Sequence, residues 1–275
     1  MKRIVLVSAV LLISMAASVG VSKDFGVAAV EDSKNILPLR ERAEVMNAWL
    51  KWRLDNIVPM LMRREGIDMW LVINREYNED PVYLSMVPEP HMAARRTSVL
   101  IFHDRGEGEG VERLSGGYYG IGEWYGPTWK DKTKKQFESL AEFIKERDPK
   151  KIGINTSEKW AFGDGLSSAL KEKLEKALGP EQSSRFVSAE NLCVGWLETR
   201  SPQELSVYRH IGGIAHDIIA EFYSNKVITP GITTTDDVVW WIRQKIVDLG
   251  LKTWFQPSIS IQRNNRLAGQ YEEQP

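Results

Sequence analysis

The residues that could carry metal or acid–base chemistry are few and widely spaced in this 275-residue chain. The four histidines are His91, His103, His210 and His216. Only the last two share a predicted helix, and their six-residue spacing separates them by about 240° around its axis. The chain contains neither a His-Glu-x-x-His motif nor a Cys/His cluster. The histidines therefore predict no metal centre of their own.

The paired acids and the single cysteine have structural interpretations. Asp236-Asp237 stands at the start of a predicted helix, where acidic side chains favour the helix dipole, and Glu272-Glu273 lies in a polar tail. Cys193 cannot form an internal disulfide, and we interpret it as a small buried hydrophobic residue. The sequence also lacks a nucleophile-elbow motif. We assign no catalytic, cofactor-binding or metal-binding residue to this chain.

The alternating glycines Gly106, Gly108 and Gly110 could suggest a phosphate-binding loop. Their pattern lacks the dinucleotide fingerprint, and no helical pattern follows directly. We predict a hairpin turn there, leading into a strand at residues 111–114.

The first residues have the pattern of a secretory signal peptide. Lys2 and Arg3 precede an apolar run from Ile4 to Ile13, and small residues follow. The run is shorter than the ~20 residues needed to span a bilayer, which favours cleavage over a retained anchor. We predict a signal peptide over 1–18, with Ala16-Ala17-Ser18 the best cleavage site, then a flexible leader over 19–35. The mature protein would be exported, periplasmic or extracellular, without stable membrane insertion.

Composition fits an ordinary globular protein, with 43% hydrophobic and 27% charged residues. The net charge of −1 supplies no long-range field for nucleic acid or an anionic membrane surface, so we expect no nucleic-acid partner. With one cysteine, an exported chain of this size must be stabilised by its core.

Strand and helix patterns alternate over residues 36–190 and predict an α/β domain. A helix opened by Pro38 and ended by Gly66 precedes a buried strand, and a polar loop over 74–90 leads to the next strand. The remaining predicted elements are a helix over 134–147, a strand over 152–155 and a helix over 166–178.

A second domain is predicted from about residue 195. Ser201-Pro202-Gln203-Glu204 has the capping-box pattern of a helix start, and Leu205, Tyr208, Ile211, Ala215, Ile218 and Phe222 form an apolar stripe after it. Thr233 to Asp236 begins another helix by the same logic, and 254–261 is predicted to be a strand. Two helices and one strand cannot bury a core of their own, so this domain looks incomplete.

Three segments in order resemble the opening of the pita-bread metallopeptidase fold. They are 198–204 (ETRSPQE), 228–236 (ITPGITTTD) and 255–259 (FQPSI). Upstream, 37–42 (LPLRER) and 64–70 (REGIDMW) resemble an exported bacterial branch of Xaa-Pro-aminopeptidase-like proteins. The family also includes prolidase, creatinase and methionine aminopeptidase. The resemblance implies a creatinase-like N-terminal domain over 36–190 and part of a pita-bread peptidase domain over 195–275.

The resemblance implies a metal-dependent aminopeptidase that acts on a peptide substrate. Members hydrolyse peptide bonds with two divalent ions (manganese, cobalt or zinc) held by two Asp, one His and two Glu. All five ligands follow the strand that begins near Phe255, so we expect none of these ions to bind this chain. The family's proton-shuttling histidine has no counterpart in residues 261–265. We expect a homo-oligomer when the protein is complete.

Two functions remain open. One is an exported metallo-aminopeptidase represented here without its metal-binding half. The other is a non-catalytic peptide- or protein-binding module with a peptidase-like fold. The downstream reading frame discriminates them, because only the enzyme requires a following Asp-x-Gly strand and later His and Glu motifs.

Overall fold

The computed structural model describes residues 35–261, which divide into two compact units. The first is Pro38–Leu205, and the second contains residues 206–261 together with residues 35–37. The predicted signal peptide, nearly all of the predicted leader and residues 262–275 lie outside the described range. Within that range, no helix has both the length and the apolar character needed to cross a membrane.

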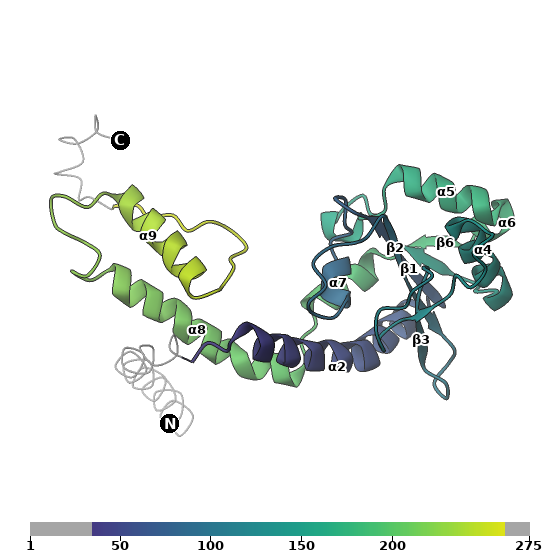
Figure 1. Ribbon diagram of the computed structural model, residues 1–275, viewed down its shortest axis with the longest axis horizontal. Helices are drawn as coiled ribbons and strands as arrows, with labels where there is room; N and C mark the ends of the chain where they lie inside the picture. The colour runs from purple at the N-terminus through teal and green to yellow at the C-terminus, as the bar shows by residue number, and fades with distance from the viewer. Residues whose placement is uncertain (1–34, 262–275) are drawn as a thin grey trace, which may run out of the picture. The chain divides into compact units, whose positions relative to one another are not determined.

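A mixed six-stranded sheet runs through the first unit (Figure 1) in the order β4-β3-β2-β1-β5-β6. The central pairs β1–β2 and β2–β3 are antiparallel, whereas β1–β5, β5–β6 and β3–β4 are parallel. The strands are β1 (Met69–Arg75), β2 (Thr97–Asp104), β3 (Val111–Ser115), β4 (Gly126–Pro127), β5 (Ile152–Ile154) and β6 (Phe186–Ser188). This unit is an α/β fold, as the alternation of patterns predicts.

Helices cover both faces of the sheet, and the buried strand β1 alternates between them. Trp70 and Val72 pack into one core with α2 (Leu39–Glu65), α3 (Tyr83–Met86) and α7 (Glu190–Glu198). Met69, Leu71 and Ile73 pack into a second core with α4 (Gln136–Arg147) and α5 (Ser168–Leu178). Both faces of β1 are buried, which explains why its sequence is a continuous apolar run rather than an alternating one. The short helices η1 (Ala161–Gly163) and α6 (Pro180–Ser183) complete the unit.

Local signals set several of these boundaries. Gly66 ends α2 in the left-handed conformation (φ 62°), and its N–H is donated to Arg63 O. β2 and β3 form an antiparallel pair ending at Asp104 and Val111, with the glycine segment between them as the turn. The helix cap and the hairpin predicted from the sequence are both confirmed.

The prediction of a polar loop over 74–90 is in part wrong. Its middle forms α3, and Val82, Tyr83 and Met86 are buried in the core beneath α2. Prolines and acidic residues surround these apolar residues, so the sequence shows no helical periodicity there. α7 is likewise not apparent from the sequence pattern, and its Trp196 packs into the same core.

The division between the two units falls after Leu205, whereas the sequence places a domain boundary at 190–195.

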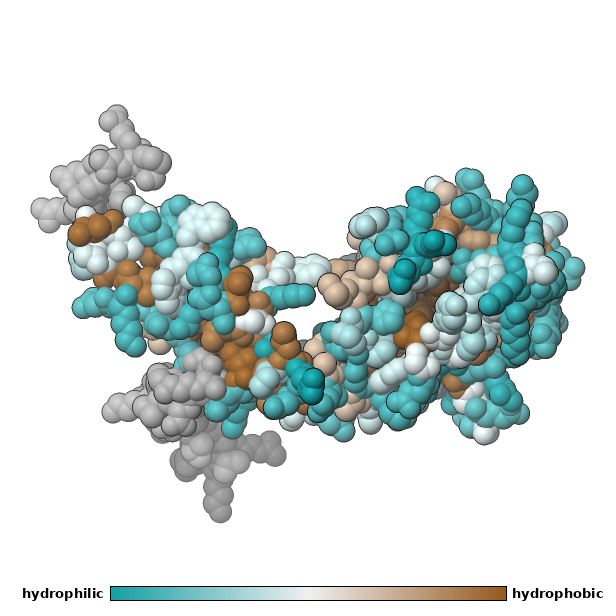
Figure 2. Space-filling view, viewed as in Figure 1, coloured by the Kyte–Doolittle hydropathy of each residue, from teal (hydrophilic) through white to brown (hydrophobic). Residues whose placement is uncertain are grey.

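The second unit contains α8 from Ser206 onward (the whole helix is Pro202–Phe222) and α9 (Thr235–Asp248). Ile214, Ile218 and Phe222 of α8 pack on Val238 and Ile242 of α9. The first half of the predicted stripe is not covered, since Leu205 is 58% and Ile211 55% exposed. Figure 2 shows hydrophobic residues in brown at the surface of this unit.

The strand predicted over 254–261 is wrong. This segment has no regular secondary structure, and most of it, including Trp254 and Phe255, is exposed. A strand is stable only when its N–H and C=O groups pair with a neighbouring strand, and no described residue pairs with this segment.

Candidate functional site

The structure separates the residues that could bind a metal. His91 lies in an exposed loop, and His103 lies on β2 with its Nδ1 3.5 Å from Glu112 Oε2. His210 and His216 lie on α8, in the other unit. Over residues 35–261, no three His, Cys, Asp or Glu side chains are placed to hold an ion. The described residues therefore do not by themselves fit a two-metal centre.

The other candidates have structural roles where they are described. Asp237 belongs to the capping box that begins α9, with its carboxylate 2.8 Å from the Thr234 backbone nitrogen. Cys193 is fully buried, and burial raises the pKa of its thiol, which disfavours the nucleophilic thiolate. Glu272-Glu273 lies outside the described residues.

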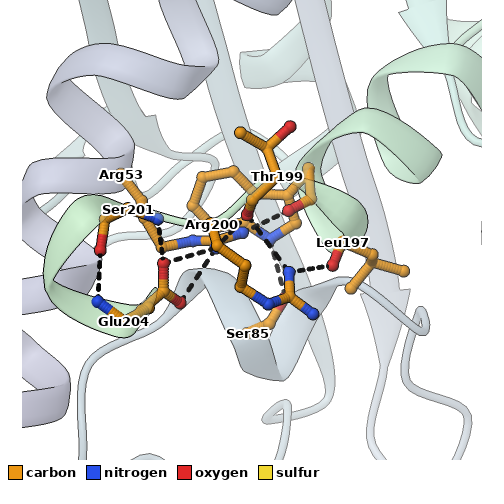
Figure 3. Close-up of polar contacts among 8 residues, drawn as sticks. Arg53, Ser85, Leu197, Thr199, Arg200, Ser201 and Glu204 are labelled. Carbon is orange, nitrogen blue, oxygen red and sulfur yellow. Dashed lines mark hydrogen bonds and ion pairs between the residues drawn. The ribbon is translucent and has the colours of Figure 1, made fainter. Parts of the chain in front are cut away.

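A cluster of polar contacts in the first unit surrounds a buried arginine of α2 (Figure 3). Arg53 is 7% exposed, and its guanidinium donates to the backbone carbonyls of Trp196 and Thr199. The guanidinium carbon also lies 4.3 Å from the centre of the Trp196 ring. Carbonyls at a helix C-terminus have no intrahelical donor, so Arg53 supplies donors to two carbonyls at the end of α7.

The same arginine reaches the first turn of α8. Arg53 Nη1 lies 3.1 Å from both carboxylate oxygens of Glu204. Glu204 Oε2 also accepts from the Ser201 N–H at 2.6 Å, and Ser201 Oγ accepts from the Glu204 N–H at 3.0 Å. The predicted capping box is therefore present, and its acid has a second, charged partner. We call Arg53, Trp196, Ser201 and Glu204 the α2–α8 joint.

A hollow of about 380 Å³ lies beside the joint, lined in part by Trp49, Arg200 and Glu204. Arg200 donates to the carbonyls of Leu197 and Thr199, and the Trp196 indole donates to Ser85 Oγ at 2.9 Å (Figure 3). Most charged groups here are engaged with the protein itself. The arrangement fixes where α8 begins.

A second buried network joins β1, β5 and the segment before α3. The Trp70 indole donates to Asn155 Oδ1 at 2.7 Å, and Asn155 Nδ2 donates to Asp80 Oδ2 at 2.8 Å. Asp80 Oδ1 accepts from the Val82 N–H at 3.0 Å. Asp80 is 1% exposed, and burial raises its pKa to about 6 against the opposing effect of these two hydrogen bonds. Its protonation therefore changes in a physiological range.

The sequence identifies one side of the α2–α8 joint and no member of the second network. Ser201 and Glu204 are recognisable because a capping box is a local, four-residue signal. Arg53 lies 151 residues before Glu204, and Asp80 lies 75 residues before Asn155. No local pattern marks such partners, since each looks like a surface residue until the chain folds.

Comparison with known proteins shows a similarity to a solved structure. No family model matches the chain, and no curated protein matches it. Among solved structures, the chain is similar to a Xaa-Pro dipeptidase from Bacillus anthracis, with 15% sequence identity and a TM-score of 0.40. The similarity covers 74% of this chain and 49% of that one, so the chain spans about half the length of the dipeptidase.

Proposed function

We propose that this chain carries the N-terminal domain and the beginning of the peptidase domain of an exported, Xaa-Pro-aminopeptidase-like metallopeptidase. The substrate would be a peptide, hydrolysed with two divalent ions whose ligands come from sequence beyond the segments that resemble the family. In that role the described residues position the start of the peptidase domain.

One observation carries this proposal. The two segments that resemble the family, 198–204 and 228–236, each lead into a helix. α8 begins at Pro202, as the sequence predicts, and α9 begins at Thr235, one residue later than the pattern from Thr233 to Asp236 predicts. Ser201 and Glu204 form the capping box of α8, and Thr234 and Asp237 form that of α9. Between them, Gly231 takes a positive φ of 80°, which suits the turn after Pro230.

The proposal is tested with two purified proteins: the 275-residue chain, and the product of its reading frame continued downstream. Calorimetric titration with manganese and cobalt is combined with hydrolysis of a Xaa-Pro dipeptide. We expect two-ion binding and turnover only in the longer product. A longer product that lacks both would favour the non-catalytic binding module. Binding of two ions with turnover by residues 1–275 alone would show that the ligand positions were misjudged.

A further inference from the structure

The first unit contains a surface hollow of about 530 Å³ whose charged lining residues differ from those of the other hollows. It lies where the loop before β2 meets the segment after β3. His91, Arg95 and Arg96 contribute to its lining, and no Asp or Glu does. Each of the four other hollows compared with it is lined by at least one carboxylate. This hollow, which we call the arginine hollow, therefore offers positive charge without an internal counter-charge.

The two arginines are held by their backbones and leave their guanidinium groups available. The Arg95 N–H is donated to Ser98 Oγ at 3.1 Å, and the Arg96 N–H to Glu76 Oε2 at 3.3 Å. The Arg96 carbonyl accepts from the Glu76 N–H at 2.9 Å. Both side chains are exposed, and within residues 35–261 neither has a carboxylate partner. These hydrogen bonds fix the backbone positions from which the two arginine side chains extend.

The backbone of Arg96 is also strained. Its φ is 52°, in the left-handed region that residues other than glycine rarely adopt. Such strain persists where the surrounding structure determines the conformation, and it concentrates at functional sites. The nearby acids Glu76 and Glu79 accept the backbone N–H groups of Arg96 and Ala94. Neither acid lines the hollow.

An aromatic surface forms another part of the lining. The rings of Tyr118 and Trp129 are stacked, with centroids 3.6 Å apart and an interplanar angle of 17°. Tyr119 also lines the hollow and is 82% exposed. Stacked rings present a flat apolar face, whereas a guanidinium fork matches the two oxygens of a carboxylate.

We propose that the arginine hollow binds a small carboxylate that carries an aromatic or similarly flat apolar group. The carboxylate pairs with Arg95 and Arg96, and the flat group packs against Tyr118 and Trp129. Arginine suits this role because its planar donors match a carboxylate in two contacts. The site uses only residues of the first unit and does not depend on the proposed peptidase function.

The test is calorimetric titration of the full chain with N-acetylphenylalanine and its neutral analogue, N-acetylphenylalaninamide. We expect one acid bound per chain, with the amide weaker by at least about tenfold. Arg95→Gln and Arg96→Gln are each expected to weaken acid binding by about tenfold. The matched control is Arg40→Gln, an exposed arginine of α2 outside the hollow, which is expected to leave the affinity within about twofold.

Further probes separate the possible sources of the carboxylate. The tripeptide Ala-Ala-Phe, compared with its C-terminal amide, tests a peptide end against a free small acid, and tighter binding of either acid supports the site. Equal binding of acid and amide would overturn the proposal. So would inorganic phosphate binding as tightly as N-acetylphenylalanine, or an equal loss in the Arg40→Gln control. Because all three arginines are exposed, unchanged melting temperatures are expected to accompany any loss.

Discussion

Arg53 Nη1 lies 3.1 Å from both carboxylate oxygens of Glu204, although 151 residues separate them in the chain. The contact joins the middle of α2 to the first turn of α8. Glu204 thus caps its own helix and also supplies the negative charge that pairs with the Arg53 guanidinium. The other contacts of that guanidinium are with backbone carbonyls. The first turn of α8, which belongs to the first unit, is held by this pair as well as by its capping box.

Removing the arginine is expected to destabilise the protein. Arg53→Leu leaves the Glu204 carboxylate, whose side chain is only 17% exposed, without its charged partner. It also removes the donor to the Trp196 carbonyl and one of the two donors to the Thr199 carbonyl. We expect a loss of about 3 kcal/mol in the free energy of unfolding, measured by urea denaturation.

Two further variants separate charge from packing. Arg53→Lys keeps the charge but loses the planar donors and the stacking on Trp196, so its loss is expected to be intermediate. A double-mutant cycle with Glu204→Gln should give a coupling energy of at least about 1 kcal/mol. A coupling near zero would mean that the carbonyl contacts, rather than the ion pair, hold the joint.

Asp80 is expected to make stability depend on pH. Its folded-state pKa is raised from 3.8 to about 6, so the folded protein binds the proton more tightly than the unfolded chain does. The stabilisation is fully present below about pH 4 and is lost as pH rises through about 6. The loss amounts to roughly 3 kcal/mol, at about 1.4 kcal/mol per unit of pKa.

The measurement compares urea denaturation at several pH values between 4 and 7.5 for wild type and Asp80→Asn. The amide stays neutral throughout, so the variant should lack this part of the pH dependence. Asp131→Asn is the control. Hydrogen bonds from Thr133 lower the pKa of Asp131 below its usual 3.8, so its stabilisation is lost only as pH falls below about 4, and this variant should keep the wild-type pH profile between pH 4 and 7.5. An unchanged pH profile in Asp80→Asn would contradict the assignment.

Two glycine substitutions are expected to have opposite effects. A Cβ on Gly165 would lie 2.1 Å from Asp80 Oδ2 and 2.8 Å from Pro81 Cδ, so the buried network must shift. We expect Gly165→Ala to cost about 1–3 kcal/mol. A Cβ on Gly212, an exposed position in α8, would meet nothing within 4 Å. Gly212→Ala should stabilise by about 0.5–1 kcal/mol through helix propensity. Thermal melts of the two variants should move in opposite directions.

The sequence predicts most of the first unit because its signals are local. Gly66, the glycines between β2 and β3, and the leucine repeat of α5 each act within a few residues. Residues 254–261 show the limit of this reasoning. Their alternation and aromatic content suit a strand, but strand formation depends on a partner at another place in the chain. α3 was missed for the related reason that its burial comes from the distant helix α2.

The two networks were not predictable because their members look unremarkable alone. Arg53 follows Trp52 on a helix whose other arginines are largely at the surface, and Asp80 precedes a proline in what reads as a loop. Their roles arise from burial and from partners more than 70 residues away. The capping residues Ser201 and Glu204 were predictable, but the second partner of Glu204 was not.

The two capping boxes are expected to differ in energetic importance because they differ in burial. Ser201 is fully buried, whereas Thr234 is exposed. In Thr234→Ala, the Asp237 N–H loses its 3.2 Å hydrogen bond to Thr234 Oγ1, but it can donate to water instead because the site is exposed. We expect a cost of about 1 kcal/mol.

In Ser201→Ala, the Glu204 N–H loses its bond at a site that water does not reach readily. An unsatisfied buried donor costs its full desolvation energy, so the loss should approach about 2 kcal/mol or more. Ser201→Thr, which retains the hydroxyl, and Thr234→Ser are the matched conservative variants. Urea denaturation of the four proteins should rank Ser201→Ala as the least stable. An equal cost for the two alanine variants would show that the buried cap is compensated, with the Arg53–Glu204 pair alone sufficient to fix the start of α8.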